Sequence, residues 1–188
     1  MAAVAVCMTC LVFAGCGTDT TSSPVGSRPD SASAAADAGD GQVVVNLAKD
    51  TAMESMDPIN AEDGFSMELI GAMMSGLYTL DGEDNLVQDL ATACTISEDN
   101  LTYTFALRED AKWSNGEPVT ANDFVFAWRR LADPAVAGAY AWMLDEVAGV
   151  KNAAAVETGE MDVTELGVSA PDDYTFVVEL SRPVPFFE

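Results

Sequence analysis

The chain has 188 residues, of which 31 are acidic and 8 are basic, and it contains no histidine. Its formal net charge of −23 repels nucleic acid and anionic lipid headgroups, so we expect neither as a partner. The absence of histidine removes the most common general base and the most common metal ligand of proteins, which disfavours acid–base catalysis and metal binding.

The first eighteen residues carry no charge, and their apolar run ends in Ala14-Gly15-Cys16. A run of this length is typical of a secretory signal peptide and is short for a membrane span. Small residues before a cysteine resemble the lipobox of bacterial lipoproteins, in which the cysteine is lipidated and becomes the first mature residue. We therefore assign residues 1–16 to a lipoprotein signal peptide and expect Cys16 to anchor the protein at the extracytoplasmic face of the cell membrane. The alternative is an ordinary signal peptide cleaved after a small residue.

Residues 17–41 consist mainly of Ser, Thr, Ala, Asp, Gly and Pro. Such a segment cannot bury enough apolar area to offset the entropy lost on ordering, so we expect a flexible tether. Beyond Cys16 the chain has one further cysteine, Cys94, so we expect neither a disulfide nor a thiolate zinc site in the folded part.

The folded part is expected to begin with a strand, a loop and a helix. Residues 42–50 hold a short β-branched run, which favours a buried strand. Residues 55–64 form a loop, because Pro58 favours an extended or turn backbone and Gly64 allows a positive φ. Residues 65–78 predict an amphipathic helix, since four apolar side chains recur at helical spacing: Met67, Ile70, Met74 and Leu77.

A hairpin, a strand and a capped helix follow. Residues 78–88 predict two short strands around an Asp-Gly turn. Apolar and polar side chains alternate over residues 101–107, which is the pattern of a half-buried strand, and residues 114–118 supply a turn. Thr120 then begins an amphipathic helix and is expected to form a capping box with Asp123.

Each feature of the stretch 101–130 has a structural explanation. Trp113 and Trp128 are expected to pack in the core, and Arg129 and Arg130 lie near the end of the helix, where cations suit its dipole. We therefore expect this stretch to be the framework of a site that lies elsewhere.

The last third of the chain is expected to alternate helical and extended segments. Residues 132–156 are rich in Ala and predict helix after Gly138, residues 157–173 predict a polar connection with one short extended piece, and residues 174–180 predict a strand. Phe186 and Phe187 end the sequence with nothing to cover them, which is the pattern expected of a chain that has been cut short.

No motif of covalent catalysis is present in the sequence: it has no Gly-x-Ser-x-Gly elbow, no P-loop and no His-Glu-x-x-His. Adjacent acids such as Glu62–Asp63 or Asp172–Asp173 would suit a two-carboxylate glycosidase, but such pairs arise by chance among 31 acids. We therefore expect a binding or surface protein and not an enzyme, without catalytic residues, cofactor or metal.

Residues 103–134, YTFALREDAKWSNGEPVTANDFVFAWRRLADP, are similar to the signature of the family 5 extracellular solute-binding proteins, which include the oligopeptide- and dipeptide-binding proteins of ABC importers. The segments 56–63, MDPINAED, and 166–187, LGVSAPDDYTFVVELSRPVPFF, also resemble that family. The resemblance extends over nearly all of residues 42–188 and is greatest to the oligopeptide-binding branch.

The resemblance implies an α/β fold: the N-terminal part of a two-lobed periplasmic-binding-protein fold of type II-like architecture. One lobe with its inserted subdomain would be present and the second lobe absent, because chains of this family run to several hundred residues. Residues 42–55 and 166–188 would belong to the hinge-bearing lobe, and the residues between them would form the subdomain.

The resemblance also implies ligand-binding residues. In the oligopeptide-binding branch an extended peptide is held by main-chain hydrogen bonds, and hydrated pockets accept varied side chains. Glu62 matches a family acid near the peptide, and Tyr140 matches an aromatic residue that touches the ligand; their neighbours Asp63 and Gly64 have weaker claims. The structural alternatives are a solvated loop acid for Glu62 and core packing for Tyr140.

The function implied is the substrate-binding component of an ABC importer, which captures extracellular oligopeptides and delivers them to a membrane permease. One alternative keeps the fold and changes the ligand to nickel, heme or a sugar. A second alternative is a tethered surface protein that binds a protein partner. Residues 42–188 alone are expected to bind peptides weakly or not at all, because they would hold half of a cleft.

Overall fold

The computed structural model describes residues 52–187, all of which fall in one of two compact units of the chain, Ala48–Glu188. The signal peptide, Cys16, the tether and the strand expected at residues 42–50 therefore lie outside the described residues. None of the helices within residues 52–187 combines the length and the apolar character needed to cross a membrane.

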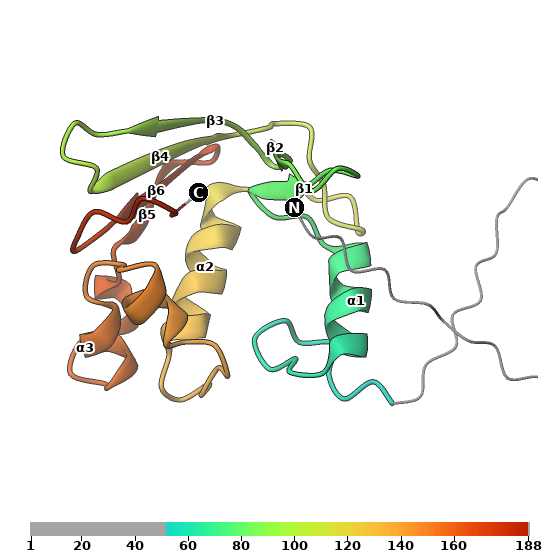
Figure 1. The fold of residues 1–188 in the computed structure, drawn as a ribbon, viewed down its shortest axis with the longest axis horizontal. Helices are drawn as coiled ribbons and strands as arrows, with labels where there is room; N and C mark the ends of the chain where they lie inside the picture. The colour runs from blue at the N-terminus through green and yellow to red at the C-terminus, as the bar shows by residue number, and fades with distance from the viewer. Residues whose placement is uncertain (1–51, 188) are drawn as a thin grey trace, which may run out of the picture. The chain divides into compact units, whose positions relative to one another are not determined.

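A four-stranded antiparallel sheet organises the described residues, with strand order β3-β4-β6-β5 (Figure 1). Its strands are β3 (Ala91–Ile96), β4 (Thr102–Leu107), β5 (Val168–Asp172) and β6 (Thr175–Glu179). In β4, Tyr103, Phe105 and Leu107 are buried and alternate with more exposed residues, so the expected half-buried strand is confirmed. Strand β6 likewise confirms the strand expected at residues 174–180.

The sheet crosses the boundary expected between the lobe and its inserted subdomain. Strand β6 lies in the segment 166–188 and pairs along β4, with Thr102 opposite Glu179 and Phe105 opposite Phe176. Within residues 52–187 the hydrogen bonds of a single sheet therefore join the two segments, and the division near Leu166 stays a prediction.

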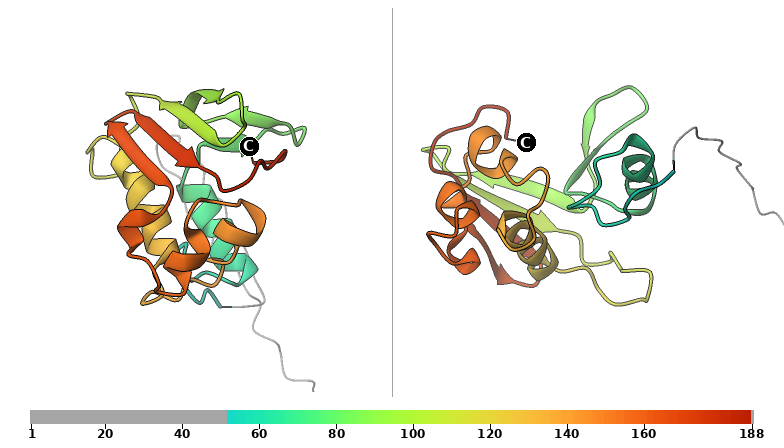
Figure 2. Two further views of the ribbon diagram at one scale, coloured as in Figure 1. Left: turned by 90° about the vertical axis from the view of Figure 1, so that its left-hand side faces the viewer. Right: turned by 90° about the horizontal axis from the view of Figure 1, so that it is seen from below.

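Helix α2 (Ala121–Ala132) covers one face of the sheet, and the shorter helices lie on the same side (Figure 2). Phe124 and Trp128 place their ring centroids 5.5 and 5.6 Å from that of Phe176. Phe105 stacks on the same ring at 6.1 Å, and both Phe105 and Phe176 are fully buried. These four aromatic side chains form the centre of the core and fix α2 on the sheet.

The N-terminus of α2 carries the expected capping box in its Asp form. The backbone N–H of Thr120 donates to the Asp123 carboxylate at 2.7 Å, and the Thr120 hydroxyl donates to the same oxygen at 3.2 Å. The indole N–H of Trp113 approaches this oxygen at 3.4 Å, and Trp113 is 45% exposed. The expectation that Trp113 packs in the core is therefore wrong, since its N–H finds an acceptor at the surface.

We expect Asp123→Ala to lower the free energy of unfolding by about 1 kcal/mol, because it removes the acceptor for the Thr120 N–H and a first-turn acid. Asn122→Ala is the matched control, since Asn122 is exposed in the same turn. Urea denaturation followed by circular dichroism measures both. Equal midpoints for the two variants would contradict a stabilising cap.

The Ala-rich segment is helical only in short pieces. They are η1 (Met143–Val147) and α3 (Ala153–Glu157), and η2 (Val163–Glu165) follows them. Gly149 and Asn152 both adopt a left-handed backbone with φ of 65°, which interrupts the helix between the first two pieces. The helix expected after Gly138 is thus confirmed only in part.

A β-hairpin precedes the sheet and agrees with the expectation. Strand β1 (Tyr78–Leu80) pairs with β2 (Leu86–Gln88) in an antiparallel register. Between them, the Asp81 carboxylate accepts the backbone N–H groups of Glu83 and Asn85 at 2.8 and 3.0 Å, which closes the turn.

Helix α1 (Gly64–Met73) is shorter and less packed than the sequence predicts. It ends before Leu77, whose carbonyl instead accepts the N–H groups of Asp89 and Ala91 and so joins the β structure. Met73 is 63% exposed, and Ser66 is the one buried residue of the helix. The amphipathic packing expected from the apolar spacing is therefore not found.

Candidate ligand-binding site

The loop before α1 turns its side chains alternately inward and outward. A turn at Asp57 is closed by the N–H of Asn60, which donates to the Asp57 carbonyl at 3.0 Å. After it, Ile59 and Ala61 are buried while Asn60 and Glu62 are exposed. The carboxylate of Glu62 is therefore directed to solvent, as a residue that meets a ligand requires.

Asp63 is the N-cap of α1, and Gly64 is the first residue of that helix. The Asp63 carboxylate accepts the N–H of Ser66 at 2.8 Å and so caps the helix. Hydrogen bonds from the Ser66 side chain and backbone lower the pKa of Asp63 below its ordinary value. Gly64 is exposed, and a Cβ there would meet no atom within 4 Å. Its φ is not positive, so the backbone does not require glycine at this position.

Tyr140 lies in the turn after α2 and is half-buried. Two residues before it, Gly138 packs so closely on the Glu62 loop that an added Cβ would lie 2.9 Å from Ile59 Cγ2. The structure thus brings the loop of Glu62 and the segment of Tyr140 into contact. The contact joins Ile59, three residues before Glu62, to Gly138, two residues before Tyr140. This close approach requires glycine at position 138.

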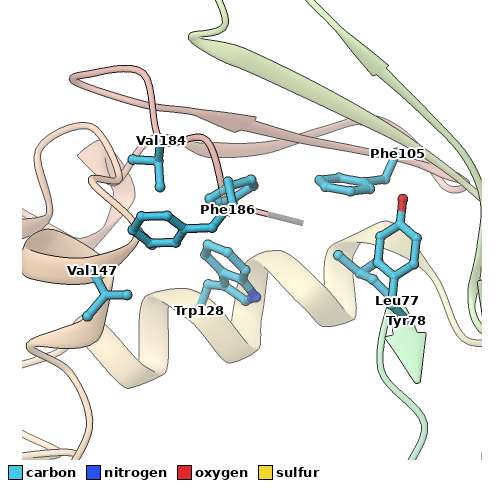
Figure 3. A pocket seen from close by; sticks show the side chains of 9 residues that line it. Leu77, Tyr78, Phe105, Trp128, Val147, Val184 and Phe186 are labelled. Atoms are coloured by element: carbon cyan, nitrogen blue, oxygen red, sulfur yellow. The ribbon is translucent and has the colours of Figure 1, made fainter. Parts of the chain in front are cut away.

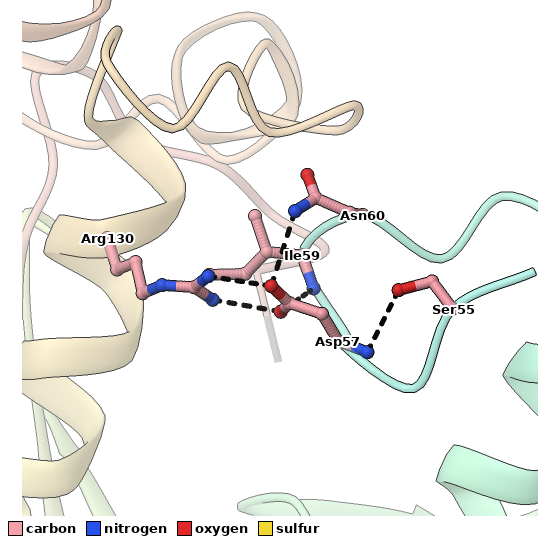
Figure 4. Close-up of polar contacts among 5 residues, drawn as sticks. All are labelled: Ser55, Asp57, Ile59, Asn60 and Arg130. Atoms are coloured by element: carbon pink, nitrogen blue, oxygen red, sulfur yellow. Dashed lines mark hydrogen bonds and ion pairs between the residues drawn. The ribbon is translucent and has the colours of Figure 1, made fainter.

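An ion pair that the sequence did not suggest fixes the same loop. Arg130 of α2 donates to both carboxylate oxygens of Asp57, at 2.8 and 2.6 Å, and both side chains are about one-third exposed (Figure 4). The hydrogen bond from Arg130, followed by that from the Ile59 N–H, lowers the pKa of Asp57 to about 2. The two residues are 73 positions apart, and nothing in a single sequence pairs them.

The Asp57 carboxylate should titrate at unusually low pH. Its pKa in the folded protein lies below the ordinary 3.8, so ionised Asp57 stabilises the loop above about pH 3.8, and this contribution is lost as the pH falls toward 2. A carbon-13 NMR titration of the Asp57 carboxyl group should give a midpoint near 2, and Arg130→Met should move it upward. A midpoint of 3.8 in the unmodified protein would contradict the ion pair.

An apolar pocket of about 210 Å³ lies elsewhere, beside the C-terminal segment (Figure 3). Phe186 and Phe187 both line it. Phe187 also packs on Tyr103 with a centroid distance of 4.5 Å, whereas Phe186 remains 69% exposed. The expectation of two uncovered rings therefore holds only for Phe186. The other lining residues come from β1, β4, α2, η1 and their flanks: Leu77, Tyr78, Phe105, Trp128, Val147, Ala148 and Val184. Glu62 and Tyr140 are not among them.

Within residues 52–187, no three side chains of His, Cys, Asp or Glu come together in a way that could hold a metal ion. What the described site offers is an exposed carboxylate, an aromatic side chain and loop backbone, which are groups suited to noncovalent recognition.

Comparison with known proteins places the chain in a family. Residues 85–188, more than half of the chain, match the family described as bacterial extracellular solute-binding proteins, family 5 Middle. The periplasmic oligopeptide-binding protein OppA of Haemophilus influenzae is 47% identical over 133 residues, which cover 71% of this chain and 24% of that protein. The oligopeptide-binding protein OppA of Bacillus subtilis is 34% identical over 177 residues, which cover 94% of this chain and 30% of that protein.

Solved structures agree with these relatives. OppA of Listeria monocytogenes bound to peptide superposes with a TM-score of 0.72 at 39% identity, over 78% of this chain and 28% of that one. OppA of Haemophilus influenzae in complex with the peptide RPPGFSPFR superposes with a TM-score of 0.68 at 47% identity, over 71% of this chain and 26% of that one. The matched region thus amounts to about a quarter to a third of each relative. The sequence match and the shared α/β architecture show that the chain belongs to the family 5 extracellular solute-binding proteins.

Proposed function

We propose that the chain is part of a substrate-binding protein that captures oligopeptides outside the cell membrane and delivers them to the permease of an ABC importer. The contact between Ile59 and Gly138 carries the proposal, because it holds the loop of Glu62 against the segment of Tyr140. The family membership and the peptide-binding relatives support the same function.

In this proposal an extended peptide lies along the loop at residues 62–64 and meets Tyr140. Main-chain hydrogen bonds hold the peptide as an added strand, and water-filled spaces accommodate its side chains, which gives affinity without sequence choice. The exposed carboxylate of Glu62 supplies a hydrogen-bond acceptor and a negative charge at the peptide. Binding involves no covalent step, so the proposal gives the chain no enzymatic role.

The proposal also includes the way in which the protein is held at the membrane. Residues 1–16 are assigned to a signal peptide, residues 17–41 to a tether and residues 42–188 to the family domain, with a lipid on Cys16. A Ser-, Ala- and Gly-rich tether would let the domain stand off the extracytoplasmic face and reach the permease.

Native mass spectrometry of the protein extracted from its own cells tests the proposal. A spread of peptide-sized masses that dissociates from the protein is the expected result. The mass of the released protein reports the lipid on Cys16 independently of any ligand. A protein that carries no ligand, or a single adduct with the mass of heme, a sugar or a metal ion, would contradict peptide binding.

We expect Glu62→Gln to weaken the retention of peptides by roughly fivefold, because it removes a charged acceptor while keeping the size of the side chain. Glu98→Gln is the matched control, since Glu98 is an exposed acid in the turn between β3 and β4. The quantity compared is the fraction of protein that carries peptide in the same native spectra. Equal fractions for the two variants would remove Glu62 from the proposed site.

A further inference from the structure

The loop of Glu62 is joined to the helix that follows it by polar contacts at the N-terminus of that helix, where Asp63 accepts the N–H of Ser66. Helix α1 buries only Ser66, and the Ser66 hydroxyl accepts the N–H groups of Glu54 and Ser55 at 3.3 and 3.2 Å. These contacts join α1 to its own preceding segment. Met67 and Met73, the two methionines of α1, remain exposed, so this helix has little apolar contact with the sheet.

Two further contacts join the loop to the region of α2. One is the packing of Ile59 against Gly138, and the other is the ion pair between Asp57 and Arg130. The Asp57 carboxylate also accepts the N–H of Ile59 and the side-chain amide of Asn60, both at 3.2 Å (Figure 4). A single carboxylate therefore shapes the turn and attaches it to α2.

The attachment on the α2 side is rigid. Arg130 lies in the last turn of a capped helix, and two side chains of that helix, Phe124 and Trp128, pack on the buried ring of Phe176. A guanidinium that makes two parallel hydrogen bonds fixes the orientation of a carboxylate as well as its distance. The ion pair with Arg130 thus fixes the course of the chain from Asp57 to Glu62 relative to α2, which is itself packed on the sheet.

We propose that Arg130 is a positioning residue for the ligand site: by fixing Asp57 through two hydrogen bonds, it sets the placement of Glu62 relative to Tyr140. The inference rests on the proposed peptide-binding function and adds a residue that acts without touching the ligand. Lysine at this position would keep the charge but lose the second hydrogen bond, so it would place the loop less well.

Hydrogen exchange of the full chain, resolved by mass spectrometry, tests whether Arg130 orders the loop. Arg130→Met should raise the exchange rate of residues 57–62 by about tenfold, and Arg130→Lys should give an intermediate rate. Arg129→Met is the matched control, because Arg129 donates to the Thr164 carbonyl at 3.0 Å and not to this loop. Unchanged exchange in Arg130→Met, or equal acceleration in β4 and β6, would overturn a local positioning role.

A second measurement connects the loop to the ligand. The probe is a pentapeptide that carries a photoreactive diazirine, and the readout is its dissociation constant from crosslinking titrations of the same proteins. We expect Arg130→Met to weaken capture by about fivefold or more, Arg130→Lys to recover part of the loss, and Arg129→Met to match the unmodified chain. Faster loop exchange with unchanged capture would overturn the positioning role. The titrations use the protein as extracted from its own cells, because residues 42–188 alone are expected to bind peptides weakly or not at all. If that protein captures no probe, the peptide-binding proposal fails, while exchange still decides whether Arg130 orders the loop.

Discussion

Phe176→Ala is expected to lower the free energy of unfolding by about 3–5 kcal/mol, as truncations of a fully buried Phe do. The ring of Phe176 contacts Phe105 from β4 and both Phe124 and Trp128 from α2. Its removal would leave a cavity between the helix and the sheet that none of these neighbours could fill without moving. Such a loss is a large part of the stability of an ordinary domain, so the variant should be partly unfolded near room temperature.

Phe126→Ala is the matched control for this substitution. It removes the same type of ring, here from α2 and not from β6, but Phe126 is 69% exposed, so the free energy of unfolding should change by less than about 0.5 kcal/mol. Urea denaturation with both fluorescence and circular dichroism measures the two variants. A similar loss in both would mean that Phe176 is not the centre of the core.

The strands, the hairpin and the capped helix could be predicted because their signals are local. The alternation of Tyr103, Phe105 and Leu107 specifies which face of β4 is buried, independently of the rest of the fold. Thr120 and Asp123 are three residues apart, so the cap is visible in the sequence. Such features depend on residues that are only a few positions apart in the sequence.

The expectations that failed depend on distant partners. The apolar spacing of residues 65–78 predicted a longer helix, but the carbonyl of Leu77 is taken by N–H groups that lie more than ten residues later, at Asp89 and Ala91. The pairing of β6 with β4, about seventy residues earlier in the chain, is likewise absent from the local pattern. Local propensity does not contain these pairings.

In the candidate site, too, the sequence could not reveal contacts between residues that are far apart in the chain. Glu62 and Tyr140 were selected by their resemblance to family positions, and the structure adds the exposure of the Glu62 carboxylate and the contact that joins the two segments. The Asp57–Arg130 pair could not be predicted, since the position of Arg130 was already explained by the helix dipole. A residue with a sufficient local explanation can still have a second partner in the folded protein.

Gly138→Val is expected to lower the free energy of unfolding by about 2–3 kcal/mol and to displace the loop of Glu62. A Cβ at position 138 would lie 2.9 Å from Ile59 Cγ2, 3.0 Å from Leu131 Cδ1 and 3.2 Å from the Leu131 carbonyl oxygen. The backbone of α2 is the least able of these to move, so Ile59 and its loop should give way. Urea denaturation measures the loss of stability, and hydrogen exchange over residues 57–62 measures the displacement.

Gly71→Ala is the control, because a Cβ there meets no atom within 4 Å and alanine favours a helix interior, so stability should rise by about 0.5–1 kcal/mol. Unchanged exchange over residues 57–62 in Gly138→Val would contradict the contact between the two segments. Combining Gly138→Val with Arg130→Met gives a stricter test, since both contacts hold the same loop. Once one contact has released the loop, loss of the second should cost little more, so the two effects on exchange should be less than additive. Full additivity would mean that the two contacts hold separate parts of the chain and do not together position Glu62.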